Sequence, residues 1–77
     1  MARTQYFVTN RGGQWMIVLN DQDYGPYKTQ RDAYLAAVDA AHKEGKQGRD
    51  AQVLIQGTDH KFRTEWTYGH DPYPPKG

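Results

Sequence analysis

The stretch TQRDAYLAAVDAAHKE, Thr29 to Glu44, is the one segment of the sequence with a clear helical period. Thr29 stands at an N-cap position, and Asp32 brings a carboxylate into the first turn, where it suits the helix dipole. At about 100° per residue, the apolar side chains that follow fall on one stripe. We expect this stripe to pack on a sheet; its members are Tyr34, Ala37, Val38 and Ala41, with Ala33 beside them.

Alanine makes up most of that stripe. The helix can therefore approach the sheet closely, and the bulky core side chains must come from the strands. We expect the helix to end at Gly45 or Gly48, because glycine is common just beyond a helix C-terminus. His42 lies at the edge of the stripe, and we expect it to face solvent.

Four short runs of β-branched, aromatic and aliphatic residues predict four strands, two on each side of the helix. Turns that contain glycine join the strands of each pair. Between the second strand and the helix, the polar run at 20–23 predicts a turn, and Gly25 and Pro26 indicate an irregular connection. The predicted strands are residues 5–10, 15–19, 52–56 and 61–68, and the predicted hairpin turns are 11–14 and 57–60.

These elements predict a single α+β domain over residues 1–77, with the order β-β-α-β-β. We expect an antiparallel sheet packed on one helix, an ordered part at about residues 4–68 and a proline-rich tail at 69–77. In the last strand, alternation predicts one aromatic face under the helix and one charged face. The aromatic residues are Phe62, Trp66 and Tyr68, and the residues between them include Lys61, Arg63, Glu65 and Thr67.

The tail, GHDPYPPKG, is excluded from helix and central strand because its prolines lack a donor and fix φ near polyproline II. It allows two expectations for Tyr73. This residue can anchor a preorganised segment in the aromatic-lined groove of a partner protein. Alternatively, the tail folds back and covers the apolar edge left by the last strand. The second expectation is favoured because so small a core needs every apolar group it has.

The run YGHDPYPPKG, Tyr68 to Gly77, resembles the closing signature of a family of small bacterial proteins known as domain of unknown function 2188. Weaker likenesses extend the resemblance through most of the chain. Gly12-Gly13-Gln14-Trp15 resembles the family's Gly-Trp hairpin, Thr29 with Ala33 resembles its Thr-x-x-x-Ala helix start, and Val53-Leu54-Ile55 with Asp59 resembles its third strand and following turn.

The sequence departs from that family pattern in two turns. Gln14 separates the glycines from Trp15, and Gln56 and His60 stand where histidine and glycine are expected. These departures leave the turn types open. The resemblance implies no activity, substrate or site, so no functional residue is carried over from it.

The composition indicates a folded chain without obvious catalytic groups. Of its 77 residues, 36% are hydrophobic and 13% aromatic, and the net charge is only +1. The absence of cysteine and serine leaves threonines and the N-terminus as nucleophiles, and Glu44 and Glu65 are the only glutamates. We therefore expect neither an enzyme nor a cofactor. With no apolar run near the N-terminus, we expect no signal peptide, no membrane span and a cytoplasmic location.

Two pairs of residues, Asp59 with His60 and His70 with Asp71, carry groups that can bind a metal ion. Their spacing matches no compact ligand pattern. A strand of eight residues would also hold the pairs more than about 20 Å apart. We expect exposed turn residues rather than a metal site.

The function expected from these observations is that of a non-catalytic binding or accessory module. Its partner would be another protein or a second copy, since an uncovered sheet face suits self-association. Tyr73 is the candidate residue in the tail.

The alternative is a nucleic-acid-binding domain. In that hypothesis Lys61 and Arg63 contact phosphates, and Trp15 or Phe7, on an uncovered sheet face, stacks on unpaired bases. The net charge of +1 is low for such a domain.

Overall fold

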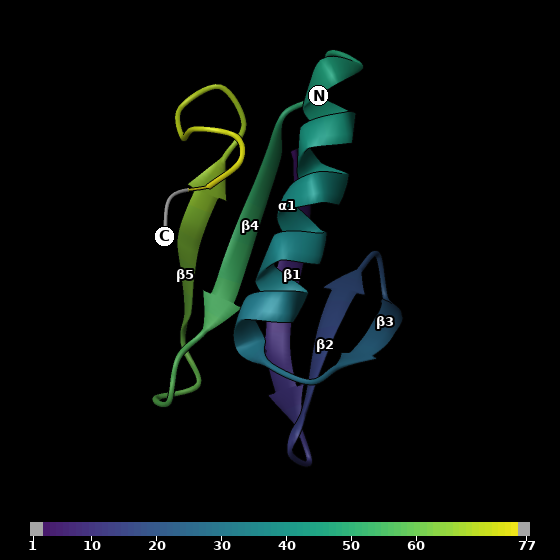
Figure 1. Ribbon diagram of the computed structural model, residues 1–77, viewed down its shortest axis with the longest axis vertical. Coiled ribbons are helices and arrows are strands. Elements are labelled where there is room, and N and C mark those ends of the chain that lie inside the picture. Colours follow the sequence, from purple (N-terminus) through teal and green to yellow (C-terminus); the bar gives the residue numbers. More distant parts are fainter. Residues whose placement is uncertain (1–2, 76–77) are drawn as a thin grey trace.

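The computed structural model describes residues 3–75 and shows one helix packed on one face of a five-stranded sheet (Figure 1). The α+β class is as predicted. Along the chain the elements are β1 (Thr4–Arg11), β2 (Gln14–Leu19), β3 (Gln22–Tyr27), α1 (Gln30–Lys46), β4 (Ala51–Gln56) and β5 (Phe62–Thr67). No helix within residues 3–75 is long and apolar enough to cross a membrane.

The sheet is mixed, so the expectation of a purely antiparallel sheet is wrong. The strand order is β3-β2-β1-β4-β5, and β1 pairs with β4 in parallel, while the other three pairs are antiparallel. The cause is the crossover through α1. The helix returns the chain over the sheet, so β4 runs in the same direction as β3 and therefore as β1.

Strand β3 was not predicted from the sequence, in which residues 20–23 were expected to form a turn and residues 24–27 an irregular connection. Asn20 and Asp21 alone form the turn, with φ of 50° and 66°, as a two-residue hairpin of this kind requires. Gly25 and Pro26 then lie inside the strand. An edge strand tolerates both residues because one of its sides has no partner, and the pairing with β2 is irregular between Trp15 and Ile17.

Helix α1 begins as predicted. The Thr29 hydroxyl accepts a hydrogen bond of 3.0 Å from the backbone N–H of Asp32. The predicted alanine stripe is buried, and it meets large side chains from the strands. The core consists of Tyr6, Val8, Ile17, Ala33, Ala37, Val38, Ala41, Ala51, Val53 and Trp66.

The two glycines proposed as helix stops have different roles. Gly48 has a φ of 92° and follows the cap residue Gln47, so it is the residue that ends the helix. Gly45 is buried inside the helix, and a Cβ there would overlap the ring of Tyr68. Gly45 therefore allows the aromatic ring to lie directly on the helix backbone.

The alternation in β5 is broken by an irregularity in its pairing with β4, between Val53 and Leu54. Trp66 pairs with Val53 and is 1% exposed in the core, as predicted. Phe62 lies on the opposite face, where its ring contacts Phe7 edge to face at 5.1 Å. The expectation that Phe62 joins the core under the helix is therefore wrong, because one extra residue in a strand reverses the face of those beyond it.

The described part of the tail folds back onto the domain; Lys76 and Gly77 lie outside the described residues. The indole Nε1 of Trp66 donates to the Pro72 carbonyl at 2.9 Å. The Tyr73 ring stacks on His42 with centroids 3.7 Å apart, and the Tyr73 hydroxyl donates to Asp39 at 2.6 Å. This agrees with the folded-back alternative, and it places His42 under an aromatic ring rather than in open solvent.

Replacing Gly45 with alanine tests the contact between the helix and Tyr68. Alanine in a helix normally stabilises by up to about 1 kcal/mol relative to glycine. Here the added Cβ must displace the ring, and overpacking of this kind costs about 1–3 kcal/mol. We expect Gly45→Ala to lower the free energy of unfolding, measured by urea denaturation. In a Tyr68→Ala background the same change should stabilise the protein, and equal effects in both backgrounds would contradict the contact.

Substitutions of Tyr73 test whether the tail is part of the fold. Tyr73→Ala removes both the stacking on His42 and the hydrogen bond to Asp39, whereas Tyr73→Phe removes only the hydrogen bond. We expect the melting temperature to fall for both variants, and to fall further for Tyr73→Ala. If both variants had the same melting temperature as the parent protein, the tail would add nothing to stability.

Candidate binding surfaces

Of the residues that the nucleic-acid hypothesis combined, Trp15 and Arg63 lie on one side of the sheet and Phe7 lies on the other. Trp15 lies on the helix-covered side of β2, partly buried against the core. Arg63 pairs with Ile55, whose side chain also packs on the core, so the two share that side of the sheet. Only Phe7 lies on the uncovered face, where it contacts Phe62.

Trp15 does lie near the hairpin that precedes Lys61. It lines a hollow of about 410 Å³ at one end of the sheet. The amide of Gln56, which also lines this hollow, is committed within the fold: its Oε1 accepts from the Thr9 hydroxyl at 2.5 Å, and its Nε2 donates to the His60 carbonyl at 3.0 Å. The other lining residues are Asn10, Gln30, Gly57, Thr58 and His60.

The charge of Arg63 is used within the hairpin. Its guanidinium donates to both carboxylate oxygens of Asp59, at 3.3 and 2.8 Å. These hydrogen bonds, followed by one from the backbone N–H of Lys61, lower the pKa of Asp59 from 3.8 to about 2. The same contact raises the pKa of Arg63. The pair is exposed, so its main effect is to fix the turn locally.

The candidate metal ligands are also accounted for by turns. Asp71 accepts a hydrogen bond of 2.8 Å from the backbone N–H of Thr67, and His60 occupies a turn position with a φ of 65°. Within residues 3–75 there is no group of three histidine, aspartate or glutamate side chains placed to hold a metal ion.

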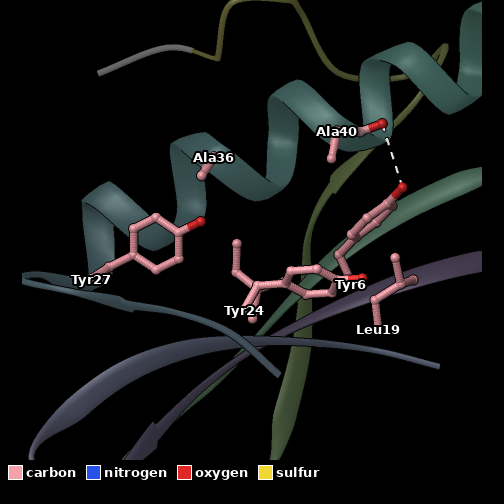
Figure 2. A pocket seen from close by; sticks show the side chains of 7 residues that line it. Tyr6, Leu19, Tyr24, Tyr27, Ala36 and Ala40 are labelled. Carbon is pink, nitrogen blue, oxygen red and sulfur yellow. Dashed lines mark hydrogen bonds between the residues drawn. The ribbon is translucent and has the colours of Figure 1, made fainter. Parts of the chain in front are cut away.

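A second hollow, which we term the tyrosine groove, lies between α1 and the strands β2 and β3. Three tyrosine side chains gather around it, with alanines of α1 above them (Figure 2). Its volume is about 200 Å³. The lining residues are Tyr6 from β1, Ile17 and Leu19 from β2, Tyr24 and Tyr27 from β3, and Ala36 and Ala40 from α1.

The groove exists because α1 covers the sheet unevenly. The helix packs mainly on β1 and β4, and less on β2 and β3 (Figure 1). On its β5 side, the helix carries His42, which is in ring contact with Tyr68 and with Tyr73 of the tail. On its β3 side, the helix presents Ala36 and Ala40, one turn apart, whose methyl groups leave space open.

The walls of the tyrosine groove are largely apolar, with hydroxyl groups at intervals. Tyr6 is 5% exposed, and its hydroxyl lies 3.5 Å from the Ala40 carbonyl, to which it donates (Figure 2). Burial, then the charge of Glu44 and the neighbouring Tyr24, raise the pKa of Tyr6 above its usual value. Tyr24 is 44% exposed, and its hydroxyl donates to Gln22 at 3.0 Å. The groove can therefore take an apolar group while hydroxyls contact its polar end.

A second surface, which we term the sheet patch, lies on the face of the sheet opposite α1. Phe7, in the central strand, pairs with Val18 on one side and Leu54 on the other, and all three are half-buried. Phe62 is 41% exposed beside Phe7. No other helix of the described chain covers this face. The sheet patch consists of Phe7, Met16, Val18, Leu54 and Phe62.

The polar side chains around the sheet patch pair with one another. Thr9 contacts Gln56, as described above, and the amide of Gln5 donates to that of Gln52 at 3.4 Å. Arg11 and Asp23 form a charged pair on this face, and their side chains lie 2.5 Å apart. The face therefore has an apolar centre with paired polar groups around it.

A comparison with protein families matches residues 6–68 to the family described as an uncharacterised protein conserved in bacteria, domain of unknown function 2188. The chain belongs to this family. The match confirms the resemblance found in the sequence, although it ends at Tyr68 and leaves the rest of the closing signature untested. No curated protein and no solved structure matches the chain. Membership in domain of unknown function 2188 therefore gives the protein relatives but no assigned site.

The tyrosine groove was not predicted from the sequence. Tyr24 and Tyr27 fell in a segment that it treated as an irregular connection, so their positions on a strand were unknown. The available signal was the pair Ala36 and Ala40, spaced one turn apart beside the main stripe, since a helix that presents alanines there leaves room for other side chains.

The ion pair between Asp59 and Arg63 predicts how pH affects the stability of the hairpin. Because the pKa of Asp59 is lowered in the folded chain, its interaction with Arg63 stabilises fully above pH 3.8 and is lost as the pH falls through about 2. We expect a carboxyl titration followed by carbon-13 NMR to place the Asp59 midpoint at about 2. In Arg63→Met the midpoint should rise toward 3.8, and an unchanged midpoint would exclude Arg63 as the main cause.

Proposed function

We propose that this protein is a small non-catalytic binding module, and that the tyrosine groove receives one apolar side chain of a partner polypeptide. The observation that carries the proposal is the gathering of three tyrosines around an open, largely apolar hollow. Tyrosine is enriched at protein interfaces, where its ring gives contact area and its hydroxyl finds a polar partner.

The size of the groove supports a single side chain as its occupant. An apolar cavity of about 150 Å³ in a protein is large enough to bind benzene. The tyrosine groove, at about 200 Å³, has room for one aromatic or branched aliphatic side chain. The apolar side chains of Ile17 and Leu19 in the lining favour such a group, and we expect the exposed Tyr24 to contact the bound backbone.

The chemistry of the lining supports binding rather than catalysis. Tyrosines are the only titratable residues among those that line the groove. The pKa of Tyr6 is raised above a usual value that already lies far above neutral pH, so its hydroxyl is protonated there and is a poor proton acceptor. An acid–base pair would need a second group with a pKa nearer to neutrality.

Nucleic-acid binding is the competing hypothesis. It would draw on the exposed cations of the loops and strand ends. Three of them are engaged in ion pairs: Arg11 with Asp23, Arg49 with Glu44, and Arg63 with Asp59. The ion pairs support a protein ligand over a phosphate backbone, and the experiment below includes oligonucleotides for this reason.

Filling the groove tests the proposal. Ala36→Leu places a side chain in the hollow, and burying one apolar side chain is worth about 1.5–3 kcal/mol. We expect peptides selected from a random library against the parent protein to bind Ala36→Leu at least about tenfold more weakly. Lys46→Leu adds the same side chain at an exposed position of α1 and serves as the control.

Amide NMR spectra locate the bound ligand. Selected peptides should shift residues of the tyrosine groove, Tyr24, Tyr27 and Ala36 among them. Peptides that bind the parent and Ala36→Leu equally would reject the groove as the site. Shifts confined to Lys61 and Arg63 on addition of short oligonucleotides, reversed by salt, would favour the nucleic-acid hypothesis instead.

A further inference from the structure

The sheet patch exposes apolar side chains that so small a domain could have used in its core. Phe7, Val18 and Leu54 form one row across three adjacent strands, and Phe62 extends the patch toward the β5 edge. Contiguous apolar surface of this kind, with polar groups only around it, marks an interaction site in most soluble proteins. The patch lies on the opposite face of the sheet from the tyrosine groove, so the two surfaces can bind different partners.

We infer that the sheet patch binds the sheet patch of a second copy of this chain. The two sheets then pack face to face, about 10 Å apart, with a helix on the outer side of each. The dimer has four layers in the order helix, sheet, sheet, helix. Such an interface uses the same surface on both copies, as a two-fold axis requires.

The charge pattern of the face fits a second copy. A surface that packs on an identical surface must not carry an excess of one sign, because like charges would then face each other. Here Arg11 and Asp23 neutralise each other within one chain. The remaining polar groups near the patch include the amides of Gln5, Gln52 and Gln56, and each amide both donates and accepts.

The area of the face also fits. Five strands about 4.8 Å apart, each about six residues long at about 3.3 Å per residue, give a sheet face of about 480 Å². Two such faces together come close to the 1,000 Å² or so that a specific interface needs. The interface is therefore at the small end of the range, and we expect an equilibrium between monomer and dimer rather than an obligate dimer.

Pairing through a sheet edge is the other route to a dimer, and both edges are protected. Strand β3 contains Pro26, which has no N–H to donate. Strand β5 carries exposed Arg63 and Glu65 and an irregularity in its pairing with β4. Charges and irregularities of this kind prevent edge pairing. The face of the sheet is left as the surface for self-association.

Analytical ultracentrifugation over a range of concentrations tests the inference. We expect the parent protein to dimerise reversibly, with a dissociation constant in the micromolar range. Phe62→Lys, which places a charge at the most exposed residue of the patch, should weaken the dimer at least about tenfold. Gln30→Lys is the control, since it adds the same charge at an exposed residue of α1, on the other side of the sheet.

The outcomes distinguish the dimer from the proposed function. A parent protein that remains monomeric up to about 1 mM, or equal weakening by both variants, would overturn the dimer, even if peptides still bind the tyrosine groove. A dimer lost only in Phe62→Lys supports it, whatever the peptides do. Circular dichroism tests whether Phe62→Lys is folded. If the variant is unfolded, the spin-label experiment below tests the dimer instead.

Because the chain has no cysteine, a spin label can be placed at one introduced cysteine without background. Thr64 pairs with Leu54 on the uncovered face, so we choose Thr64→Cys, with Lys46→Cys on α1 as the control. In a mixture with an isotope-labelled parent copy, the label at residue 64 should broaden the amides of the sheet patch. Broadening confined to α1, or none at all, would overturn the face-to-face dimer.

Discussion

The close approach of α1 to the central strands is the contact on which the rest of the structure depends. Alanines at 33, 37 and 41 allow this approach, and because they add little bulk, the strands supply the large core side chains, Trp66 above all. A small residue also allows close packing near the end of the helix, where the absence of a side chain at Gly45 lets Tyr68 cover the backbone. A domain of this length has few apolar groups to bury, so close packing replaces a large core.

The local part of this arrangement could be predicted from the sequence, because local chemistry determines it. The N-cap at Thr29, the buried stripe and four of the strands follow from hydrogen-bonding groups and periodicity within a few residues. The mixed sheet could not be predicted in that way. Whether β4 pairs with β1 in parallel depends on where the crossover ends, and that depends on packing between residues more than forty positions apart.

The candidate surfaces were harder to predict, because each depends on which face of the sheet a side chain lies on. The sequence indicated that Phe62 and Trp66 share one side of β5, but an irregularity in the pairing with β4 puts them on opposite sides. Trp15 was assigned to an uncovered face and lies against the core. For Tyr73, one of the two expectations was that the tail folds back onto the domain, and the structure shows this contact. That expectation was favoured because so small a domain needs to bury its apolar groups.

The helix and the sheet patch lie on opposite faces of a single sheet, and this has a consequence for how strongly the protein can bind. A pair of chains joined through their sheets turns both tyrosine grooves outward, where they are free to act together. A partner with two suitable side chains would then bind the second groove at the high local concentration created by the first. Such bivalence can raise affinity by about 100-fold or more without any new contact. Although each groove alone would bind one side chain weakly, the dimer would in this way bind repeated or dimeric partners with high affinity and selectivity.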